Sequence, residues 1–227
     1  MRRFKSLGIA LVVMLAAGMV AAMAAAGDEL TVEANPSTIS GISEGKALVF
    51  TPQYGETVCL QATYAGTFSG PSTSLTVAPS FPAKSEGGYN CAIKSFPAEV
   101  DLNGCDYLFS VNGGGSTTGT AKIQCPAGKE ITFTSKPFFE ETVRCSIHVP
   151  EQVFPAGSVT YANVGLGTTR EITASINVVE AVHYTQTEGI GGGKCMSLAS
   201  SSGNWSAKVL LTAAAESNGM HAGLFLS

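Results

Sequence analysis

Charged and aromatic residues are scarce in this chain of 227 residues, and the side chains on which enzymes most often depend are scarcer still. Charged residues make up 13% of the chain and aromatic residues 8%, and there are three histidines and one tryptophan. Aspartate occurs only at Asp28, Asp101 and Asp106. The sequence contains no GxSxG elbow, no HExxH helix, no phosphate-binding loop and no calcium loop of alternating aspartates. A catalytic function based on any of these motifs is therefore not expected.

Long apolar runs are confined to the start of the chain. Three cations lie within the first five residues, Leu7–Val20 is apolar, and Ala24–Ala26 fits the small-x-small pattern of a cleavage site. These features predict a secretory signal peptide over residues 1–26, and an uncleaved membrane anchor is the alternative. We expect residues 27–227 to form a single β-rich extracellular domain without a transmembrane anchor after cleavage.

Basic residues are few in the part of the chain that remains after cleavage. The whole chain has 13 basic and 17 acidic residues, and loss of the three N-terminal cations leaves 10 basic residues and a formal charge of −7. Nucleic acid is therefore not an expected partner, because its binding depends largely on neutralising phosphates. The many Gly, Ser and Thr residues are typical of a β-rich extracellular protein.

All the cysteines lie in the exported part. An even number of cysteines in an oxidising compartment predicts disulfides, whereas a metal site is disfavoured because no two cysteines have CxxC spacing. We expect Cys105 to pair with Cys125 from strand register, and we propose the two remaining pairs from proximity in the sequence and by elimination. The predicted pairs are Cys59 with Cys91, Cys105 with Cys125, and Cys145 with Cys195.

The clearest strand pattern surrounds the middle cysteine pair. Apolar residues alternate from Cys105 to Val111 and again from Gly119 to Cys125, and the glycine-rich segment 112–116 between them favours a chain reversal. A reversal centred on Gly115 places each apolar residue opposite another and each cysteine opposite the other. A shift of one residue would put polar side chains on this face, so the register is well defined.

Further segments alternate in the same way, with apolar and polar residues on opposite faces. Thr142–Val149 and Arg170–His183 are predicted strands. Trp205–Ala215 is ambiguous between helix and strand, with strand favoured by the flanking Ser, Thr and Gly residues. Together these patterns predict an all-β fold, a disulfide-stapled antiparallel β-sandwich of about ten to twelve short strands.

The runs around the cysteines also allow a comparison. They are Val58–Gly66, Asn103–Phe109, Cys125–Gly128 and Val143–Ile147. Together they resemble a group of secreted, uncharacterised bacterial all-β proteins with paired cysteines. The resemblance implies export and fold, but no activity, because none is assigned to that group.

Few residues are candidates for chemistry or binding. His148, His183 and His221 are isolated from one another in the sequence and fit structural or solvent-facing roles better than catalysis. An aromatic platform for a sugar is one hypothesis, although its tryptophan fits the core equally well. That platform would consist of Tyr54, Tyr89 and Trp205.

Two other surface features have simple structural explanations. Phe138–Glu141 is expected at a loop tip, where a partner could bind, but an ordinary hairpin tip with solvated glutamates is the favoured explanation. Asn204-Trp205-Ser206 fits the N-glycosylation pattern, which is attributed to chance in a bacterial protein.

The sequence therefore predicts a secreted, non-catalytic module with a binding or structural role and no cofactor or metal. A cell-surface or carbohydrate ligand is the partner considered. The alternative is a secreted hydrolase whose site is assembled from distant loops. A pocket that gathers a histidine, a carboxylate and a hydroxyl or thiol within hydrogen-bonding distance would favour the hydrolase.

Overall fold

A computed structural model gives the fold of the chain. The described residues form 20 β-strands and one short 3-10 turn, η1 (Gly167–Thr169), and every strand pairing among them is antiparallel. The predicted signal peptide, residues 1–26, lies outside the described residues. The structure describes residues 29–52, 56–85, 88–94, 96–113, 116–135, 145–188 and 198–227.

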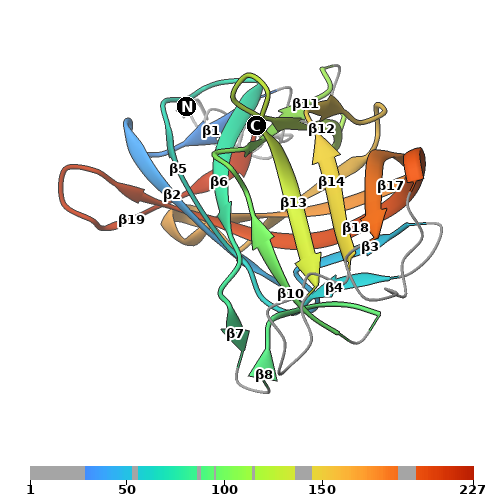
Figure 1. Cartoon of the computed structure of the whole chain (residues 1–227). Coiled ribbons are helices and arrows are strands. Elements are labelled where there is room, and N and C mark those ends of the chain that lie inside the picture. Colours follow the sequence, from blue (N-terminus) through green and yellow to red (C-terminus); the bar gives the residue numbers. More distant parts are fainter. Residues whose placement is uncertain are drawn as a thin grey trace, which may run out of the picture.

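The strands lie in two packed layers whose strand directions cross. In Figure 1 the front layer runs from top to bottom, while the two longest strands cross behind it. These long strands form one antiparallel hairpin, and each has 18 residues. The front strands are β6 (Ser74–Ser80), β10 (Phe96–Asp101), β13 (Glu130–Ser135) and β14 (Cys145–Pro150), and the hairpin consists of β17 (Glu171–Glu188) and β18 (Leu198–Ala215).

One half of the long hairpin belongs to a first closed circuit of strands. Here Ile172–Val178 pairs with Trp205–Leu211, and the hydrogen-bonded order β18-β2-β5-β6-β11-β12-β16-β17 returns to β18. Closing a sheet on itself removes the open edges at which other chains could pair. The strands not yet given are β2 (Ser37–Ser43), β5 (Thr63–Phe68), β11 (Asp106–Val111), β12 (Thr118–Gln124) and β16 (Val159–Val164).

The other half of the hairpin closes a second circuit. Here Val182–Gln186 pairs with Leu198–Gly203, and the order β18-β3-β4-β9-β10-β13-β14-β17 returns to β18. The candidate site described below lies in this circuit. Its remaining strands are β3 (Leu48–Thr51), β4 (Thr57–Cys59) and β9 (Cys91–Ile93).

A bulge in β17 marks the point where the hairpin passes from one circuit to the other. The pairing between β17 and β18 is irregular between Val178 and Val182, and Glu180 there has a φ of 52°. The backbone N–H of Glu180 donates a 2.7 Å hydrogen bond to Oδ1 of Asn204. A bulge bends its strand, and this one lies where the neighbour of β17 changes from β16 to β14.

Short strands complete the fold. β1 (Leu30–Val32) pairs with β20 (Leu224–Leu226), so the two ends of the described chain lie side by side (Figure 1). Leu30 of β1 and Leu224 of β20 are almost fully buried. The other short strands are β7 (Lys84–Ser85), β8 (Gly88–Tyr89), β15 (Gln152–Val153) and β19 (His221–Ala222).

One continuous hydrophobic core fills the space between the layers. Trp205 lies within it, and its ring centroid is 5.3 Å from that of Tyr107 and 5.1 Å from that of Phe154. Phe50 packs edge-on against Tyr184 in the same core. Since the chain has a single tryptophan, the emission of Trp205 reports directly on core packing.

The predicted fold class is confirmed, whereas the predicted number of strands is too small, and β17 and β18 are the described strands that are not short. The central hairpin has the expected register, with Tyr107 opposite Ile123 and Val111 opposite Gly119. The ambiguous segment Trp205–Ala215 is strand, within β18. The described residues form 20 strands instead of ten to twelve. β2 lies in a segment that was not predicted as a strand, the predicted strand Thr57–Thr67 is divided into β4 and β5, and β7, β8, β15 and β19 have only two residues each.

Candidate functional site

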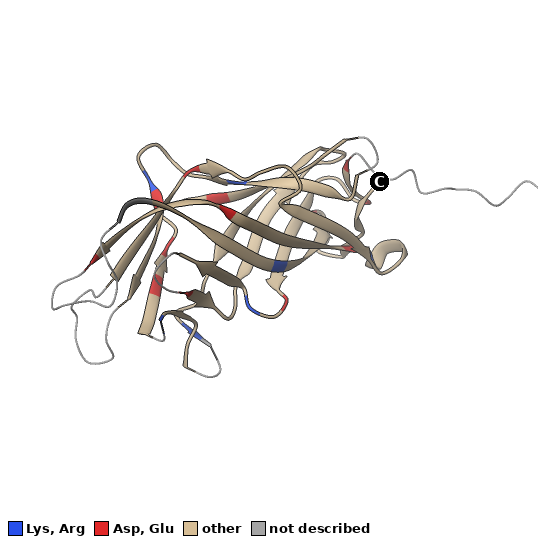
Figure 2. Ribbon diagram, turned by 90° about the vertical axis from the view of Figure 1, so that its right-hand side faces the viewer, with Lys and Arg blue, Asp and Glu red and all other residues tan. Residues whose placement is uncertain are grey.

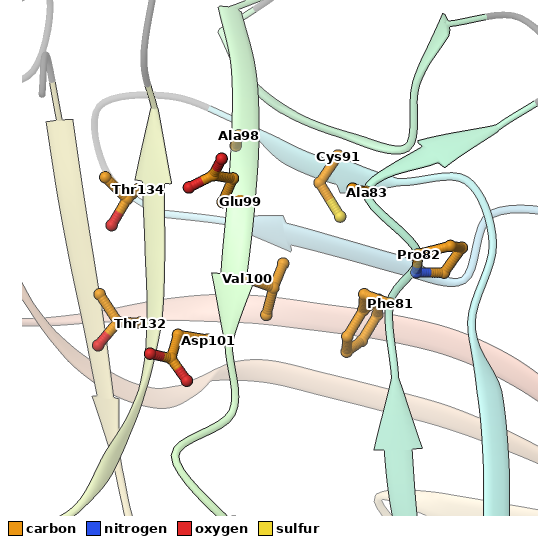
Figure 3. Close-up of a pocket in the computed structure, with 10 residues that line it drawn as sticks. All are labelled: Phe81, Pro82, Ala83, Cys91, Ala98, Glu99, Val100, Asp101, Thr132 and Thr134. Carbon is orange, nitrogen blue, oxygen red and sulfur yellow. The ribbon is translucent and has the colours of Figure 1, made fainter. Parts of the chain in front are cut away.

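A large cleft lies in the second circuit, beside β10. It has a volume of about 560 Å³ and lies between β10 and the segment Phe81–Ala83, which leads from β6 to β7 (Figure 3). Ligand sites commonly have volumes of about 300–1,000 Å³, so this cleft is large enough for a small molecule or a short stretch of peptide. Its described lining is formed by Phe81, Pro82, Ala83, Cys91, Ala98, Glu99, Val100, Asp101, Thr132 and Thr134.

The cleft exists because two neighbours of β10 have different lengths. On one side β9 pairs with Phe96–Ala98, and this pairing ends at Cys91, the first residue of β9, opposite Ala98. On the other side β13 pairs with Ala98–Asp101. The second half of β10 therefore continues beyond the end of β9, and the cleft occupies the space that a longer β9 would fill.

The polar side of the cleft is formed by two pairs of facing residues on β10 and β13. Glu99 lies opposite Thr134, and Asp101 lies opposite Thr132. Directly opposite residues have Cβ atoms about 4.5–5.5 Å apart, and residues two apart on a strand share a face about 6.4–6.8 Å apart. Figure 3 shows both carboxylates directed toward the two threonines. The site thus presents two carboxylate and hydroxyl pairs in parallel rows.

Asp101 is held in position by the turn that follows β10. The backbone N–H of Asn103 donates a 3.0 Å hydrogen bond to Oδ1 of Asp101. Such a bond from two residues further along the chain is typical of an Asx turn. Glu99 and Asp101 are both exposed, whereas Thr132 and Thr134 are half-buried. The carboxylates are thus accessible to a ligand that enters from solvent.

The apolar side of the cleft lies on the other face of β10. Val100 points away from the carboxylates and toward Phe81 (Figure 3), and both side chains pack against the hydrophobic core. Cys91 and Ala98 are buried at the base. A ligand in the cleft therefore meets an apolar slot on one side of β10 and acceptor groups on the other.

A histidine, a carboxylate and a hydroxyl come together next to the cleft. Nδ1 of His148 lies 2.8 Å from Oε1 of Glu130 and 3.5 Å from Oγ1 of Thr132. In a catalytic triad the carboxylate and the nucleophile contact different ring nitrogens, so that a proton can pass through the ring. Here both groups contact the same nitrogen on a partly exposed strand surface. This arrangement orients His148 but does not activate a hydroxyl.

The other two histidines lie elsewhere and do not join this group. Nδ1 of His221 lies 2.8 Å from the carbonyl oxygen of Thr168, next to η1. The backbone N–H of His183 donates to Oε1 of Gln152, and its side chain is exposed. Among the described residues, no group of three or more His, Cys, Asp or Glu side chains could hold a metal ion.

Two of the predicted disulfides are confirmed. Cys59 is bonded to Cys91 across β4 and β9, and Cys105 is bonded to Cys125 at the base of the central hairpin. Cys145 has no free thiol. Cys195 lies outside the described residues, so its bond to Cys145 stays a prediction.

The hypothesis of an aromatic platform for a sugar is wrong for Trp205. Trp205 is 4% exposed and belongs to the core, so it cannot stack on a sugar at the surface. Tyr54 lies outside the described residues, as does the loop tip Phe138–Glu141. Asn204, the acceptor of the glycosylation pattern, lies inside β18 and binds the backbone of Glu180, which gives it a structural role.

The residues of the cleft were not singled out by the sequence. Glu99 and Asp101 alternate with Val100 in the segment 96–102 that leads into the central hairpin, which is a weak indication that both acids lie on one face of a strand. Phe81–Ala83 lies in the segment 79–88, which its Pro, Lys and Gly residues identify as a surface loop. The contact between these two segments arises from the strand order and has no local signal.

The arrangement can therefore hold a ligand but offers little chemistry of its own. Among its described lining residues there is no histidine, no free thiol and no serine. No helix in the described part of the chain is long and apolar enough to span a membrane. No protein-family model, curated protein or solved structure matches the chain.

Proposed function

We propose that the protein is an exported, non-catalytic binding module and that its ligand occupies the cleft beside β10. The observation that carries this proposal is the combination of size and lining: about 560 Å³ bounded by an apolar slot and by two rows of acceptor groups. Binding sites in proteins typically combine an apolar surface with a few placed polar groups. The closed circuits supply a rigid framework on which such a site keeps its shape.

Export is part of the proposal. The N-terminal features of the sequence support it, and so do the two disulfides, which form and persist in oxidising compartments. The resemblance to secreted bacterial proteins with paired cysteines supports the same location. A binding site on an exported module would meet ligands of the cell surface or of the surrounding medium.

No activated nucleophile is found among the described residues that line the cleft, which favours binding over hydrolysis. Nucleophilic catalysis requires a hydroxyl or thiol within reach of a base. In the described lining the only hydroxyls belong to Thr132 and Thr134, and the sulfur of Cys91 is bonded to Cys59. The nearby base, His148, contacts Thr132 through the nitrogen that also contacts Glu130.

One observation favours a second candidate, a glycoside hydrolase. Glu99 and Asp101 point to the same side of β10, and glycoside hydrolases use two carboxyl groups about 5–5.5 Å or about 6.5–9.5 Å apart. Release of reducing sugars by the purified protein, lost in Glu99→Gln with ligand affinity retained, would establish this function. It would contradict the non-catalytic proposal.

A ligand screen with two matched variants tests the proposal. The mature protein, residues 27–227, is applied to arrays of neutral saccharides, anionic saccharides and basic peptides. Ala83→Trp fills the cleft from its exposed rim, whereas Ala127→Trp adds the same side chain at an exposed turn outside the cleft.

We expect a retained ligand whose binding is lost in Ala83→Trp and kept in Ala127→Trp. The proposal fails if the arrays retain no ligand, or if both variants bind as the unchanged protein does. An unchanged melting temperature and an unchanged far-UV circular dichroism spectrum in both variants show that the fold is intact.

A further inference from the structure

The side of β10 that borders the cleft is an unpaired strand edge. The pairing of β9 with β10 ends where Cys91 lies opposite Ala98, whereas β13 pairs with β10 as far as Asp101. Among the described strands, only β9 and β13 pair with β10. An unpaired edge presents backbone N–H and C=O groups and is a ready template for another strand.

The backbone groups of Val100 point toward the cleft. Successive residues of a strand direct their N–H and C=O groups to opposite sides. The carbonyl oxygen of Asn90 accepts a 2.9 Å hydrogen bond from the N–H of Leu60, which follows β4. The groups of the next residue, Cys91, therefore point the other way, toward Ala98 of β10. Those of Val100, two residues further along β10, point to the same side as those of Ala98, beyond the first residue of β9.

The open part of this edge is short. On the cleft side, the described residues form no strand pairing and no turn or loop hydrogen bond with the backbone of Val100. Further along, the carbonyl oxygen of Leu102 accepts a 2.8 Å hydrogen bond from the N–H of Cys105. The edge that another strand can use therefore covers residues 99–101, a length of about 10 Å.

The far side of the cleft is formed by a second strand end. β11 pairs with β6 only from Ser74 to Val77, so the last residues of β6 have no described strand partner on that side. Figure 3 shows β6 leading into Phe81–Ala83, across the cleft from β10. The cleft is therefore a division between two strands that do not pair with each other.

The volume of the cleft fits a short stretch of extended chain. One residue of a packed strand occupies about 160 Å³, from a rise of about 3.3 Å, a strand spacing of about 4.8 Å and a layer spacing of about 10 Å. The cleft volume of about 560 Å³ therefore holds about three to four residues. The length of the open edge and the volume of the cleft thus agree.

Basic side chains are few around this edge. Figure 2 shows that lysines and arginines are sparse along the strands. The described lining of the cleft contains neither, although lysine is a common protection of open strand edges. Backbone hydrogen bonds and apolar contacts are therefore the interactions with which this edge can hold a strand.

The alternation of a strand determines which ligand side chains enter the apolar slot. In an antiparallel pair, residues directly opposite each other place their side chains on the same face. Val100 points toward Phe81 (Figure 3), so a ligand residue opposite Val100 places its side chain in the slot between them. The same ligand residue directs its N–H and C=O groups to those of Val100. Its two neighbours point to the opposite face.

We infer that the cleft binds an extended segment of a partner protein as an additional antiparallel strand on β10, with alternate apolar residues in the slot. The direction is that of β9, which occupies the same edge of β10. A second copy of this chain does not supply the segment through its own β10, because that strand is flanked by β13 and by Phe81–Ala83. The inference rests on the proposed function, because it names the class of ligand for the same cleft.

Titration calorimetry of the mature protein, residues 27–227, with blocked synthetic peptides tests the inference. The first comparison is between Thr-Val-Thr-Val-Thr and its rearrangement Thr-Val-Val-Thr-Thr, and we expect the alternating peptide to bind more tightly. The second comparison uses the alternating peptide with N-methyl groups on both valines or on two threonines. Methylation of the valines should weaken binding by at least about fivefold, the worth of one backbone hydrogen bond, and methylation of the threonines should weaken it less.

Two variants at one position test the same bond from the side of the protein. Val100→Pro and Val100→Ala both reduce the side chain in the slot, but only proline removes the N–H that faces the cleft. This N–H takes no part in the pairing with β13, and proline is tolerated on a strand edge of this kind. We expect Val100→Pro to bind the alternating peptide at least about fivefold more weakly than Val100→Ala. If Val100→Pro does not fold, the methylated peptides decide the question with the unchanged protein.

Each contrary result has a distinct meaning. Equal affinity for the two methylated peptides, or equal affinity of the two folded variants, overturns the added strand. Equal binding of the alternating and rearranged peptides overturns the inference because the slot then selects no alternation. A saccharide whose binding is lost in Ala83→Trp, with no binding of either valine peptide, overturns the inference and leaves the proposed function standing. Loss of discrimination between Ala83→Trp and Ala127→Trp for every ligand refutes the proposed function itself.

Discussion

Removal of the Cys105–Cys125 disulfide offers a quantitative test of the fold. The bond joins residues separated by 20 positions in the sequence, at the base of the hairpin formed by β11 and β12. In the chain-entropy account, closing a loop of this size stabilises the folded state by about 3.3 kcal/mol at 25 °C, because it restricts the unfolded chain. Replacing both cysteines by alanine should remove this contribution.

The measurement uses the single tryptophan. Urea unfolding followed by the emission of Trp205 should give a free energy of unfolding lower by about 3–4 kcal/mol, with a larger dependence on urea because the unfolded chain is less compact. For a chain of this size the melting temperature should fall by about 7–13 °C. Cys59→Ala/Cys91→Ala, with a separation of 32, should lose slightly more, about 3.7 kcal/mol. A loss below about 1 kcal/mol in either variant would refute this reasoning.

Three further predictions concern the core and the strand pairing. Gly119→Ala should destabilise by about 3 kcal/mol or more, measured by urea unfolding, because the new Cβ would lie 1.8 Å from the carbonyl oxygen of Ser110. Asn204→Ala should cost about 1 kcal/mol in the same assay, because the N–H of Glu180 loses its partner, and Asn204→Asp should retain most of the stability. Burial raises the pKa of three tyrosines in the folded state. The free energy of unfolding should therefore be constant below the unfolded pKa of about 10 and should fall above it by about 1.4 kcal/mol per pH unit for each tyrosine. Tyrosinate absorbance and unfolding at alkaline pH measure this loss. These tyrosines are Tyr64, Tyr107 and Tyr161.

Local patterns predicted the strands well where one face is buried. β11 and β12 alternate so regularly that their register and the Cys105–Cys125 bond follow from the residues alone. The long strand β17 was partly recognisable for the same reason, from Ile172 to Val178. In these segments apolar residues occupy the buried positions and polar residues the exposed ones, so the pattern of burial can be recognised in the sequence.

The partners of the strands could not be predicted, because they depend on contacts between distant segments. β2 pairs with β18 across more than half of the chain, and no feature of Ser37–Ser43 indicates this. The role of Asn204 was missed for the same reason, since its partner Glu180 lies on another strand. Gly119 was placed on the apolar face correctly, but its lack of a side chain is explained only by the closeness of Ser110.

The cleft begins where the pairing between β9 and β10 ends, and this position links the Cys59–Cys91 disulfide to the proposed site. Cys91 lies opposite both Ala98 of β10 and Cys59 of β4, to which it is bonded. The bond therefore fixes the last pair of β9 with β10, and the cleft begins immediately beyond it. A reduced chain would keep the same residues but lose the covalent link that fixes this end, so the shape of the site depends on oxidation. In the function proposed above, export, oxidation and a preformed cleft are therefore consecutive conditions for binding.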